Sequence, residues 1–256
     1  MRFVVLGSGT TVPDAERGPA GFLVQVGHLT WLVDGGSGTL QRCVRAGVDP
    51  RALAGGIYSH RHPDHTGDLV PLLFSMRVGP PPREAPYPIW AGVGFQAFFS
   101  GLRAAYGHWL EPAGGVDITE LSLDAPQDVR LSAALRLRTA PAAHSAGALH
   151  LRFETAEGVI VFSGDTGPSA ALIELATGAD LLVVECAGSD AEQIPGHLWP
   201  SAIHTIAVAA RPAQIWLTHL YPHVDGKDAV RTVAASGVPV RRANDGDVWN
   251  ATPTQS

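Results

Sequence analysis

The sequence has few charged residues and almost no lysine. Charged residues make up 16% of its 256 residues, the formal net charge is -6, and Lys227 is the only lysine. Proteins that bind nucleic acids through their phosphates usually present a broad basic surface, which this composition does not provide. The composition therefore disfavours a nucleic acid as the partner.

Cysteines and long hydrophobic runs are also scarce. The two cysteines, Cys43 and Cys186, lie in separate apolar stretches without the paired spacing of a zinc clip or a disulfide framework. The apolar run at residues 3–6 is too short for the core of a signal peptide, and no run reaches the length of about 18 apolar residues that a membrane span needs. We therefore expect a cytoplasmic protein without a membrane partner.

The sequence does contain enough apolar residues for a sizeable core. Hydrophobic residues make up 45% of the chain, and its length lies near the upper limit for an undivided domain. Because each sheet must bury its apolar face, the order of strand-like and helix-like segments predicts a layered α/β domain over residues 1–256, with sheets inside and helices outside. The expected strands are 3–6, 22–26, 29–33, 57–58, 88–91, 129–137, 149–153, 159–162, 181–184, 215–217 and 238–240. The expected helices are 38–46, 69–76, 95–106, 169–176, 201–210 and 227–235.

A proline-rich stretch at residues 78–88 interrupts this pattern. Proline removes backbone donors and fixes the chain direction, so we expect an exposed loop there. The aromatic segment that follows, as far as Glu111, is either a lid or an ordinary core helix. Its large side chains fit either a homodimer interface or the core: Trp90, Phe98, Phe99 and Trp109.

The strongest signal for chemistry is a histidine-rich motif after a short apolar strand. It reads His60-Arg61-His62-Pro63-Asp64-His65, a pattern that chance would place in a chain of this composition with odds of about one in a thousand. In an extended backbone, His60 and His62 point to the same side, so both imidazoles can bind one cation. The proline then bends the chain, and Asp64 and His65 approach a second cation from another direction.

Three further polar residues stand where predicted strands begin or end. A catalytic zinc usually takes three protein ligands and keeps a position for water, so the motif alone supplies too few ligands for two ions. His144 precedes one strand, and Asp165 and His219 each directly follow another, where the loops of an α/β sheet meet in a crevice. Each has an ordinary structural explanation by itself, but together with the motif they predict a site for two metal ions.

The order of these residues resembles the metallo-β-lactamase superfamily. The resemblance covers nearly the whole chain and rests on the His-x-His-x-Asp-His motif, the single His144, the Gly-Asp-Thr turn at Asp165 and the Thr-His pair at His219. The glycine-rich segments 6–10 and 34–39 are similar to the branch of the ribonuclease Z-like tRNA 3′-processing endonucleases and cyclic phosphodiesterases. The resemblance implies a four-layer αββα sandwich, in which helices flank two mixed β-sheets and the metal ions lie at one edge.

The resemblance also implies a role for each residue. Two groups of three ligands would hold one ion each, and one aspartate would bridge the ions: His60, His62 and His144; Asp64, His65 and His219; and Asp165 as the bridge. Asp34 would orient a ligand imidazole, or it only shapes the glycine turn. The family suggests two zinc ions, although manganese or iron suits the same ligands.

The implied nucleophile is a hydroxide that would bridge the two ions. Asp64 would hold this hydroxide in position and later accept its proton. His197, in a Gly-His pair, matches a histidine that touches the substrate phosphate in the endonuclease branch, or it caps the next helix. Two features depart from the tRNA-processing enzymes. The segment 184–187 lacks the histidine of their His-Glu-Ala-Thr stretch, and only about twenty residues separate His144 from Asp165, enough for two strands but not for a tRNA-binding arm.

We therefore predict a binuclear metal-dependent hydrolase that acts on a small-molecule substrate, a small or cyclic phosphodiester. The alternative is a lactone or thioester hydrolase on the same scaffold, in which Tyr221 binds the substrate as an oxyanion donor. A tRNA 3′-processing endoribonuclease and a non-catalytic binding protein are less favoured. A non-catalytic member is expected to have lost a ligand, and none of the seven is missing.

Overall fold

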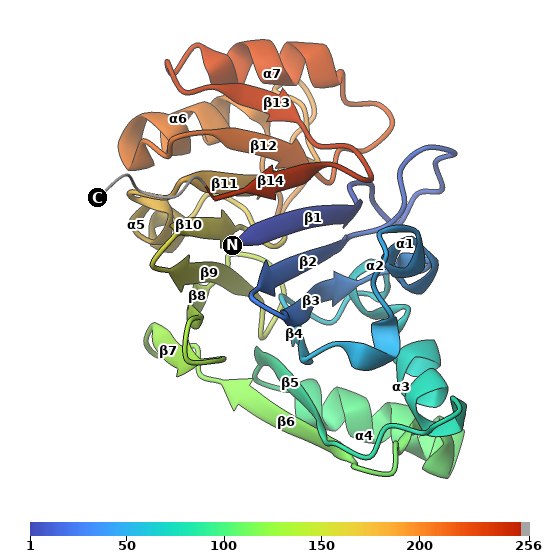
Figure 1. Cartoon of the computed structure of the whole chain (residues 1–256). Helices are drawn as coiled ribbons and strands as arrows, with labels where there is room; N and C mark the ends of the chain where they lie inside the picture. Colours follow the sequence, from blue (N-terminus) through green and yellow to red (C-terminus); the bar gives the residue numbers. More distant parts are fainter. Residues whose placement is uncertain (252–256) are drawn as a thin grey trace.

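Two seven-stranded β-sheets form the interior of the protein, in a computed structural model that describes residues 1–251 (Figure 1). The first sheet contains β1 (Arg2–Gly7), β2 (Gly21–Val26), β3 (Leu29–Gly35), β4 (Gly55–Tyr58), β5 (Tyr87–Gly92), β6 (Val116–Leu121) and β14 (Val248–Asn250). The second contains β7 (Gln127–Arg130), β8 (Arg136–Pro141), β9 (Leu149–Thr155), β10 (Gly158–Phe162), β11 (Leu181–Glu185), β12 (Ile215–Thr218) and β13 (Val240–Arg242).

Each sheet has an antiparallel half and a parallel half. The first has the strand order β14-β1-β2-β3-β4-β5-β6, and the second has the order β13-β12-β11-β10-β9-β8-β7. The strands from β14 to β3 pair antiparallel and those from β3 to β6 pair parallel. Likewise, β7 to β10 pair antiparallel and β10 to β13 pair parallel. Both sheets are therefore mixed, as predicted.

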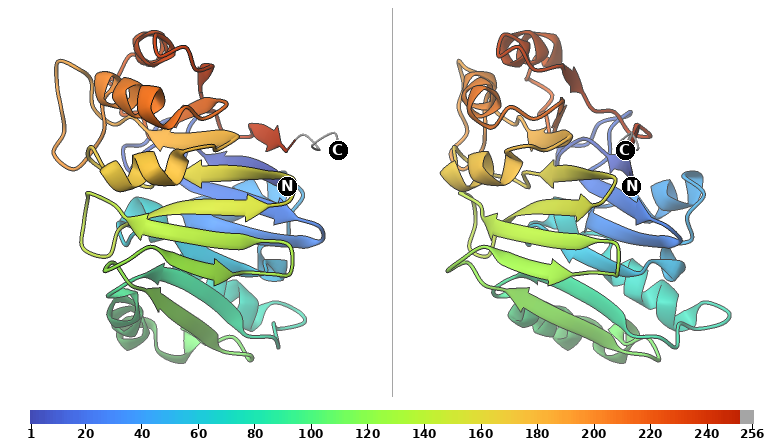
Figure 2. Two further views of the ribbon diagram at one scale, coloured as in Figure 1. Left: turned by 90° about the vertical axis from the view of Figure 1, so that its left-hand side faces the viewer. Right: turned by 60° about the vertical axis from the view of Figure 1, so that its left-hand side comes forward.

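Helices cover the outer face of each sheet, so that the protein has four layers (Figure 2). The first sheet is covered by α1 (Thr39–Arg45), α3 (Leu69–Val78) and α4 (Phe95–Tyr106), and the second by α5 (Ala170–Ala176), α6 (Pro200–Ala210) and α7 (Gly226–Ala234). Shorter helices are η1 (Pro50–Ala52), α2 (Pro63–Thr66) and η2 (Gly107–Leu110). This is the predicted αββα sandwich.

Three apolar layers hold the sandwich together. In β2, the side chains of Phe22 and Val24 face the second sheet, whereas Leu23 faces the helices. Because a strand between two layers buries both of its faces, its sequence is a continuous apolar run and does not alternate with polar residues. The same reason explains the apolar runs of β10 and β11.

One predicted strand was wrong. Residues 129–137 do not form a single strand, because β7 and β8 are separate strands that a turn joins, and Leu131 donates its backbone N–H to the carbonyl of Leu135. Val129 and Leu137 are partners across this hairpin, so both apolar side chains face the core. The short strands β6 and β14 were not predicted.

The segment between β5 and β6 packs against the first sheet. The proline-rich segment between α3 and β5 forms the predicted loop, and α4, which lies between β5 and β6, buries Phe95 and Phe99 in the core. Trp90 and Phe98 also pack partly against core clusters, but Trp109 is 49% exposed. The predicted set of Trp90, Phe98, Phe99 and Trp109 therefore forms no continuous surface patch, and the homodimer stays a prediction. No helix within residues 1–251 combines the length and the apolar character that crossing a membrane requires.

Candidate metal centre

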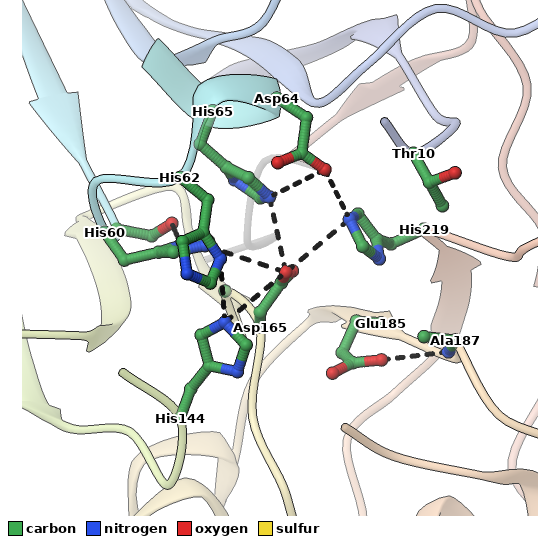
Figure 3. Close-up of polar contacts among 12 residues, drawn as sticks. Thr10, His60, His62, Asp64, His65, His144, Asp165, Glu185, Ala187 and His219 are labelled. Atoms are coloured by element: carbon green, nitrogen blue, oxygen red, sulfur yellow. Dashed lines mark hydrogen bonds and ion pairs between the residues drawn. The ribbon is translucent and has the colours of Figure 1, made fainter. Parts of the chain in front are cut away.

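The histidine-rich motif forms where β4 ends and the short helix α2 begins. His60 follows β4, whose residues Ile57 and Tyr58 are fully buried. His62 is the N-cap of α2, and Pro63 takes the first helical position, where a missing N–H has no cost. Figure 3 shows the imidazole and carboxylate groups of the motif pointing to one centre.

The other three predicted side chains reach this centre from loops of the second sheet. His144 lies between β8 and β9, Asp165 follows β10, and His219 follows β12. Backbone bonds join loops of the two sheets, because Leu149 donates to the carbonyl of Ser59 at 2.9 Å and His219 donates to that of Ser8 at 2.9 Å. The structure thus brings all seven predicted side chains together.

One oxygen of Asp165 lies at the middle of the cluster. Its Oδ2 atom is 3.7 Å from the Nε2 atom of His60, 3.4 Å from that of His65, 3.9 Å from that of His144 and 3.5 Å from that of His219. On one side of it, His62 Nδ1 lies 3.1 Å from His144 Nε2. This central position is what a carboxylate that bridges two cations requires.

The seven predicted ligands fall into two groups that each fit one metal ion, and a third group, Asp165, His197 and His219, overlaps with both. Within each group, all ligand atoms lie within 4.8 Å of one another. The Nε2 atoms of His60 and His65 are buried and have no hydrogen-bond partner in the protein, which leaves their lone pairs available to a cation. The groups are His60, His62, His144 and Asp165, and then Asp64, His65 and His219.

The negative charges of the centre have no arginine or lysine partner. Within residues 1–251, the carboxylates of Asp34, Asp64, Asp165 and Glu185 form ion pairs with imidazoles alone. All are at least nine-tenths removed from solvent, and buried anions require a compensating cation. The chemistry of the cluster therefore suits divalent metal ions.

The pKa values of the cluster agree with that assignment. Burial lowers the pKa of His60 well below its usual value, and the neighbouring His65 acts in the same direction. Burial also opposes the protonation of His65, but Asp165 and Asp34 outweigh it and raise the pKa of His65 well above its usual value. Burial disfavours the Asp165 anion, but His219 and His65 outweigh it and hold the pKa of Asp165 well below its usual value. His60 and Asp165 are thus kept in the neutral and anionic forms that bind metals, and the carboxylates around His65 favour a positive charge, which a metal ion would supply in place of a proton.

Asp34 connects two of the histidines. It accepts hydrogen bonds from the backbone N–H of Ser59 at 2.7 Å and from its hydroxyl at 2.7 Å, and its Oδ2 lies 2.8 Å from His65 Nδ1. Ser59 Oγ is in turn 3.1 Å from His60 Nδ1. If Nδ1 carries the proton in both rings, both Nε2 atoms face the centre as acceptors. Ser59 directly precedes the motif, but its sequence position alone did not predict this role.

Backbone strain also concentrates at the centre. Within residues 1–251, three non-glycine residues have a left-handed φ, and two of them are Asp34 (φ 53°) and His219 (φ 55°). This conformation is unfavourable for most residues and is often retained at functional sites. It places both side chains at the ends of their strands, facing the centre.

His197 lies beside the cluster and is oriented by Glu185. Its Nδ1 atom is 2.9 Å from Glu185 Oε1, and its ring stacks on that of His219 with centroids 5.8 Å apart. Burial opposes protonation of His197, but Glu185 outweighs it and raises the pKa of the imidazole. Glu185 is the last residue of the buried strand β11. A carboxylate at the end of a buried strand is a signal for function, but from the sequence only the missing histidine in this segment was predicted to matter.

Tyr221 lies at the edge of the same cluster. Its ring centroid is 5.9 Å from that of His219, and the side chain is half-buried. Burial and the nearby Asp64 raise the pKa of its hydroxyl, so the group stays a hydrogen-bond donor at neutral pH.

Comparisons with known proteins agree with the fold and the site. A family model described as the Beta-lactamase superfamily domain matches residues 30–220. The ribonuclease Z of Mycolicibacterium paratuberculosis (strain ATCC BAA-968 / K-10) is 33% identical over 196 residues, which cover 72% of this chain and 69% of that protein.

Two solved structures are similar over nearly the whole chain. The metallo-β-lactamase fold protein YhfI from Bacillus subtilis has a TM-score of 0.84 with 23% identity, over 97% of this chain and 99% of that one. The short form of human tRNase Z has a TM-score of 0.81 with 20% identity, over 98% of this chain and 100% of that one. At these identities the two structures show a shared fold.

The chain therefore belongs to the metallo-β-lactamase superfamily and is a metal-dependent hydrolase. Within the superfamily, its curated relatives are enzymes named ribonuclease Z.

Proposed function

We propose that this hydrolase uses two metal ions to cleave a small or cyclic phosphodiester. The observation that carries the proposal is the position of Asp165 Oδ2, within 3.9 Å of imidazole nitrogens from both ligand groups. In this assignment, His60, His62 and His144 hold one ion, Asp64, His65 and His219 hold the other, and Asp165 binds both.

The ligand set suits zinc, with manganese or iron as substitutes. Two ions bound here would make a nucleophile available from water at neutral pH and would stabilise charge on the phosphoryl oxygens. Asp64 has a side chain that is 10% exposed and lies 3.3 Å from His219 Nε2. It therefore can accept a proton from the attacking water while it holds its metal ion.

His197 and Tyr221 are the proposed groups for the substrate. Glu185 fixes the imidazole of His197 through Nδ1, which leaves Nε2 as the donor to a phosphoryl or leaving-group oxygen. The hydroxyl of Tyr221 is a second donor at the edge of the centre. Both residues therefore stabilise the charge that develops on the substrate.

The loops of the centre favour a small substrate. The four segments 59–66, 142–148, 163–167 and 217–223 contain one basic residue besides histidine, Arg61, and its guanidinium is bonded to two backbone carbonyls. Between His144 and Asp165, β9 and β10 form a tight hairpin that leaves no inserted arm. A polynucleotide is usually held by a basic groove along its backbone, which these loops do not supply.

A ribonuclease activity is the second candidate, because the relative with 33% identity is named ribonuclease Z. A lactone or thioester hydrolase is a third, for which Tyr221 would be the oxyanion donor.

One substrate panel separates these candidates. Zinc- and manganese-loaded protein is assayed with bis(p-nitrophenyl) phosphate, 2′,3′-cyclic nucleotides, a tRNA precursor with a 3′ extension, and a set of lactones and thioesters. We expect turnover of the small phosphodiesters and none by Asp165→Ala. Efficient cleavage of the tRNA precursor at its 3′ end would replace our proposal with the ribonuclease, and turnover of lactones or thioesters alone would replace it with the third candidate.

A further inference from the structure

Arg61 links three loops around the metal centre. It stands between His60 and His62 in the motif, but its guanidinium contacts other parts of the chain. Nη1 donates to the carbonyl of Gly94 at 3.1 Å, and Nη2 donates to the carbonyl of Ala146 at 3.0 Å. These residues are 33 and 85 positions away in the sequence, and Ala146 lies two residues after His144.

The two loops that Arg61 reaches are in close backbone contact with each other. A Cβ atom at Gly92 would lie 1.9 Å from the carbonyl oxygen of Gly147, and a Cβ atom at Gly147 would lie 2.4 Å from that of Val93. Gly147 also has a φ of 84°, which favours glycine. The loop before α4 and the loop of His144 therefore fit together only because both have glycine at the contact.

The two ends of the His144 loop are held by different groups. On the side before His144, the N–H of Ala143 donates to Thr166 Oγ1 at 3.0 Å, and the N–H of Gly167 donates to the carbonyl of Ala143 at 2.8 Å. On the side after it, Arg61, the Gly147 contact and the bond from the N–H of Leu149 to the carbonyl of Ser59 connect the loop to the first sheet. Arg61 thus connects the loop of His144 to the histidine-rich motif.

We propose that Arg61 is a positioning residue, which sets the distance of His144 from His60 and His62 and so controls the affinity of the ion that these three histidines hold. The inference rests on the metal centre of the proposed function. His144 Nε2 already lies 3.1 Å from His62 Nδ1, and zinc–nitrogen bonds have a narrow range near 2.0–2.1 Å. A small shift of the His144 loop therefore weakens this group of ligands and leaves Asp64, His65 and His219 in place.

The chemistry of arginine is essential to this role. Its planar guanidinium has donors on separate nitrogens and can bond two carbonyls at once. A lysine ammonium has one nitrogen and cannot reproduce both contacts in the same geometry. Arg61→Lys should therefore have a partial effect, and Arg61→Met should have the full effect.

The test is a chelator competition titration that measures the affinity of each of the two zinc ions in the full-length protein. We expect Arg61→Met to lower the affinity for one zinc ion by about tenfold or more and to leave the affinity for the other unchanged. Residues that support a metal ligand typically contribute 10- to 100-fold in affinity. The matched control is Arg77→Met, because Arg77, in the last turn of α3, also donates through Nη1 to a backbone carbonyl, that of Glu111 at 2.7 Å. This control should bind both ions as the wild type does.

A double-mutant cycle identifies the ion. His144→Ala removes the ligand that Arg61 is proposed to position. Adding Arg61→Met to His144→Ala should therefore cause no further loss of zinc affinity, whereas the losses would add if the two residues acted independently.

A glycine pair tests the loop contact without changing a charge. Gly147→Ala pushes the two loops apart and should lower the affinity for the same ion. Gly178 has a similar positive φ of 69°, but a methyl group added there meets no atom within 4 Å. Gly178→Ala therefore separates backbone strain from the loop contact.

The outcomes are distinguishable. If both Arg61 variants bind two ions like the wild type while His144→Ala loses one, the role of Arg61 is wrong and the metal centre stands. An equal loss of affinity for both ions in Arg61→Met also overturns this role. Arg61→Lys gives the same test if Arg61→Met does not fold. A wild-type protein that binds no metal overturns the proposed function and this inference together.

Discussion

The two halves of the metal centre are held by different chemistry. In the half with His60, His62 and His144, the groups that directly contact the ligand imidazoles are neutral: Ser59 Oγ lies 3.1 Å from His60 Nδ1, and the carbonyl of Gly196 lies 2.9 Å from His144 Nδ1. In the half with Asp64, His65 and His219, the support of His65 is a buried carboxylate, Asp34, at 2.8 Å.

This difference predicts unequal binding of the two ions. A carboxylate partner raises the basicity of a ligand imidazole more than a neutral oxygen does. The half supported by Asp34 should therefore hold its ion more tightly, and the half supported by neutral groups should exchange its ion first. Asp165 joins the halves and limits how far they can behave independently.

The largest effect should come from removing the junction. Asp165→Ala takes away the oxygen that both halves share, so it should reduce metal content and lower the hydrolase activity by about a thousandfold or more. Elemental analysis and activity assays measure both results, with Asp128→Ala at an exposed, distant carboxylate as the control. A variant that keeps both ions and its activity would contradict the bridging role.

The next largest effect should come from a residue that belongs to neither half. His197→Ala removes the proposed donor to the substrate and should lower kcat by about 10²- to 10³-fold. Glu185→Gln keeps the imidazole but replaces its anionic partner, so it should have a smaller effect on kcat. Metal content should not change in either variant. Loss of an ion from His197→Ala would instead make His197 a ligand, as its closeness to Asp165 and His219 would permit.

A matched pair of substitutions tests the comparison directly. Asp34→Asn keeps a side chain that tolerates a left-handed φ but removes the charge behind His65, and it should weaken the tighter ion by about 10- to 100-fold. Ser59→Ala removes the neutral partner of His60 and should weaken the other ion by less. Zinc titrations of both variants check this, and equal losses from both ions in each variant would remove the distinction between the halves.

The smallest effect concerns a buried histidine that has no free nitrogen. His150 Nδ1 donates to the carbonyl of Ser163 at 2.6 Å, and its Nε2 lies 3.0 Å from Ser169 Oγ. Burial lowers the pKa of His150 to about 4, against the opposing effect of the Ser163 carbonyl. As the pH falls, His150 therefore binds a proton near its ordinary pKa of about 6.5 in the unfolded chain, and only at lower pH in the folded protein.

This contribution to stability is complete above pH 6.5 and is lost as the pH falls towards 4. For His150 alone, the loss should reach about 2 kcal/mol between pH 7 and pH 5. It is measured as the difference between the wild type and His150→Asn in the free energy of unfolding by urea, with metal removed by a chelator. Asparagine retains a donor for the Ser163 carbonyl but does not titrate. An equal pH dependence in both proteins would contradict the buried neutral state.

Much of the fold could be predicted, because strands buried on both faces are continuous apolar runs. The prediction was wrong at 129–137, because the paired residues Val129 and Leu137 show the same apolar character in one strand or in two. It also omitted β6, where the exposed Asp117 and Glu120 interrupt the apolar pattern of an edge strand. One domain over residues 1–256 stays a prediction.

For the site, the sequence indicated the candidate ligands and one group that supports them, Asp34, but not the other supporting groups. The seven side chains stand in a recognisable order at strand ends, and metal chemistry restricts which residue types serve. Ser59 and Arg61 have no such restriction, since a serine or an arginine in a loop is ordinary in any protein.

The order of amino acids by itself determined the layered fold and the residue types at the centre, because burial patterns and ligand chemistry are local properties of the chain. Only the tertiary structure decided which carbonyl, hydroxyl or carboxylate lies behind each imidazole. Hydrogen bonds depend on distances of a few tenths of an ångström between loops up to 85 residues apart, such as the one from Arg61 to Ala146. Such distances exist only once both sheets have packed together.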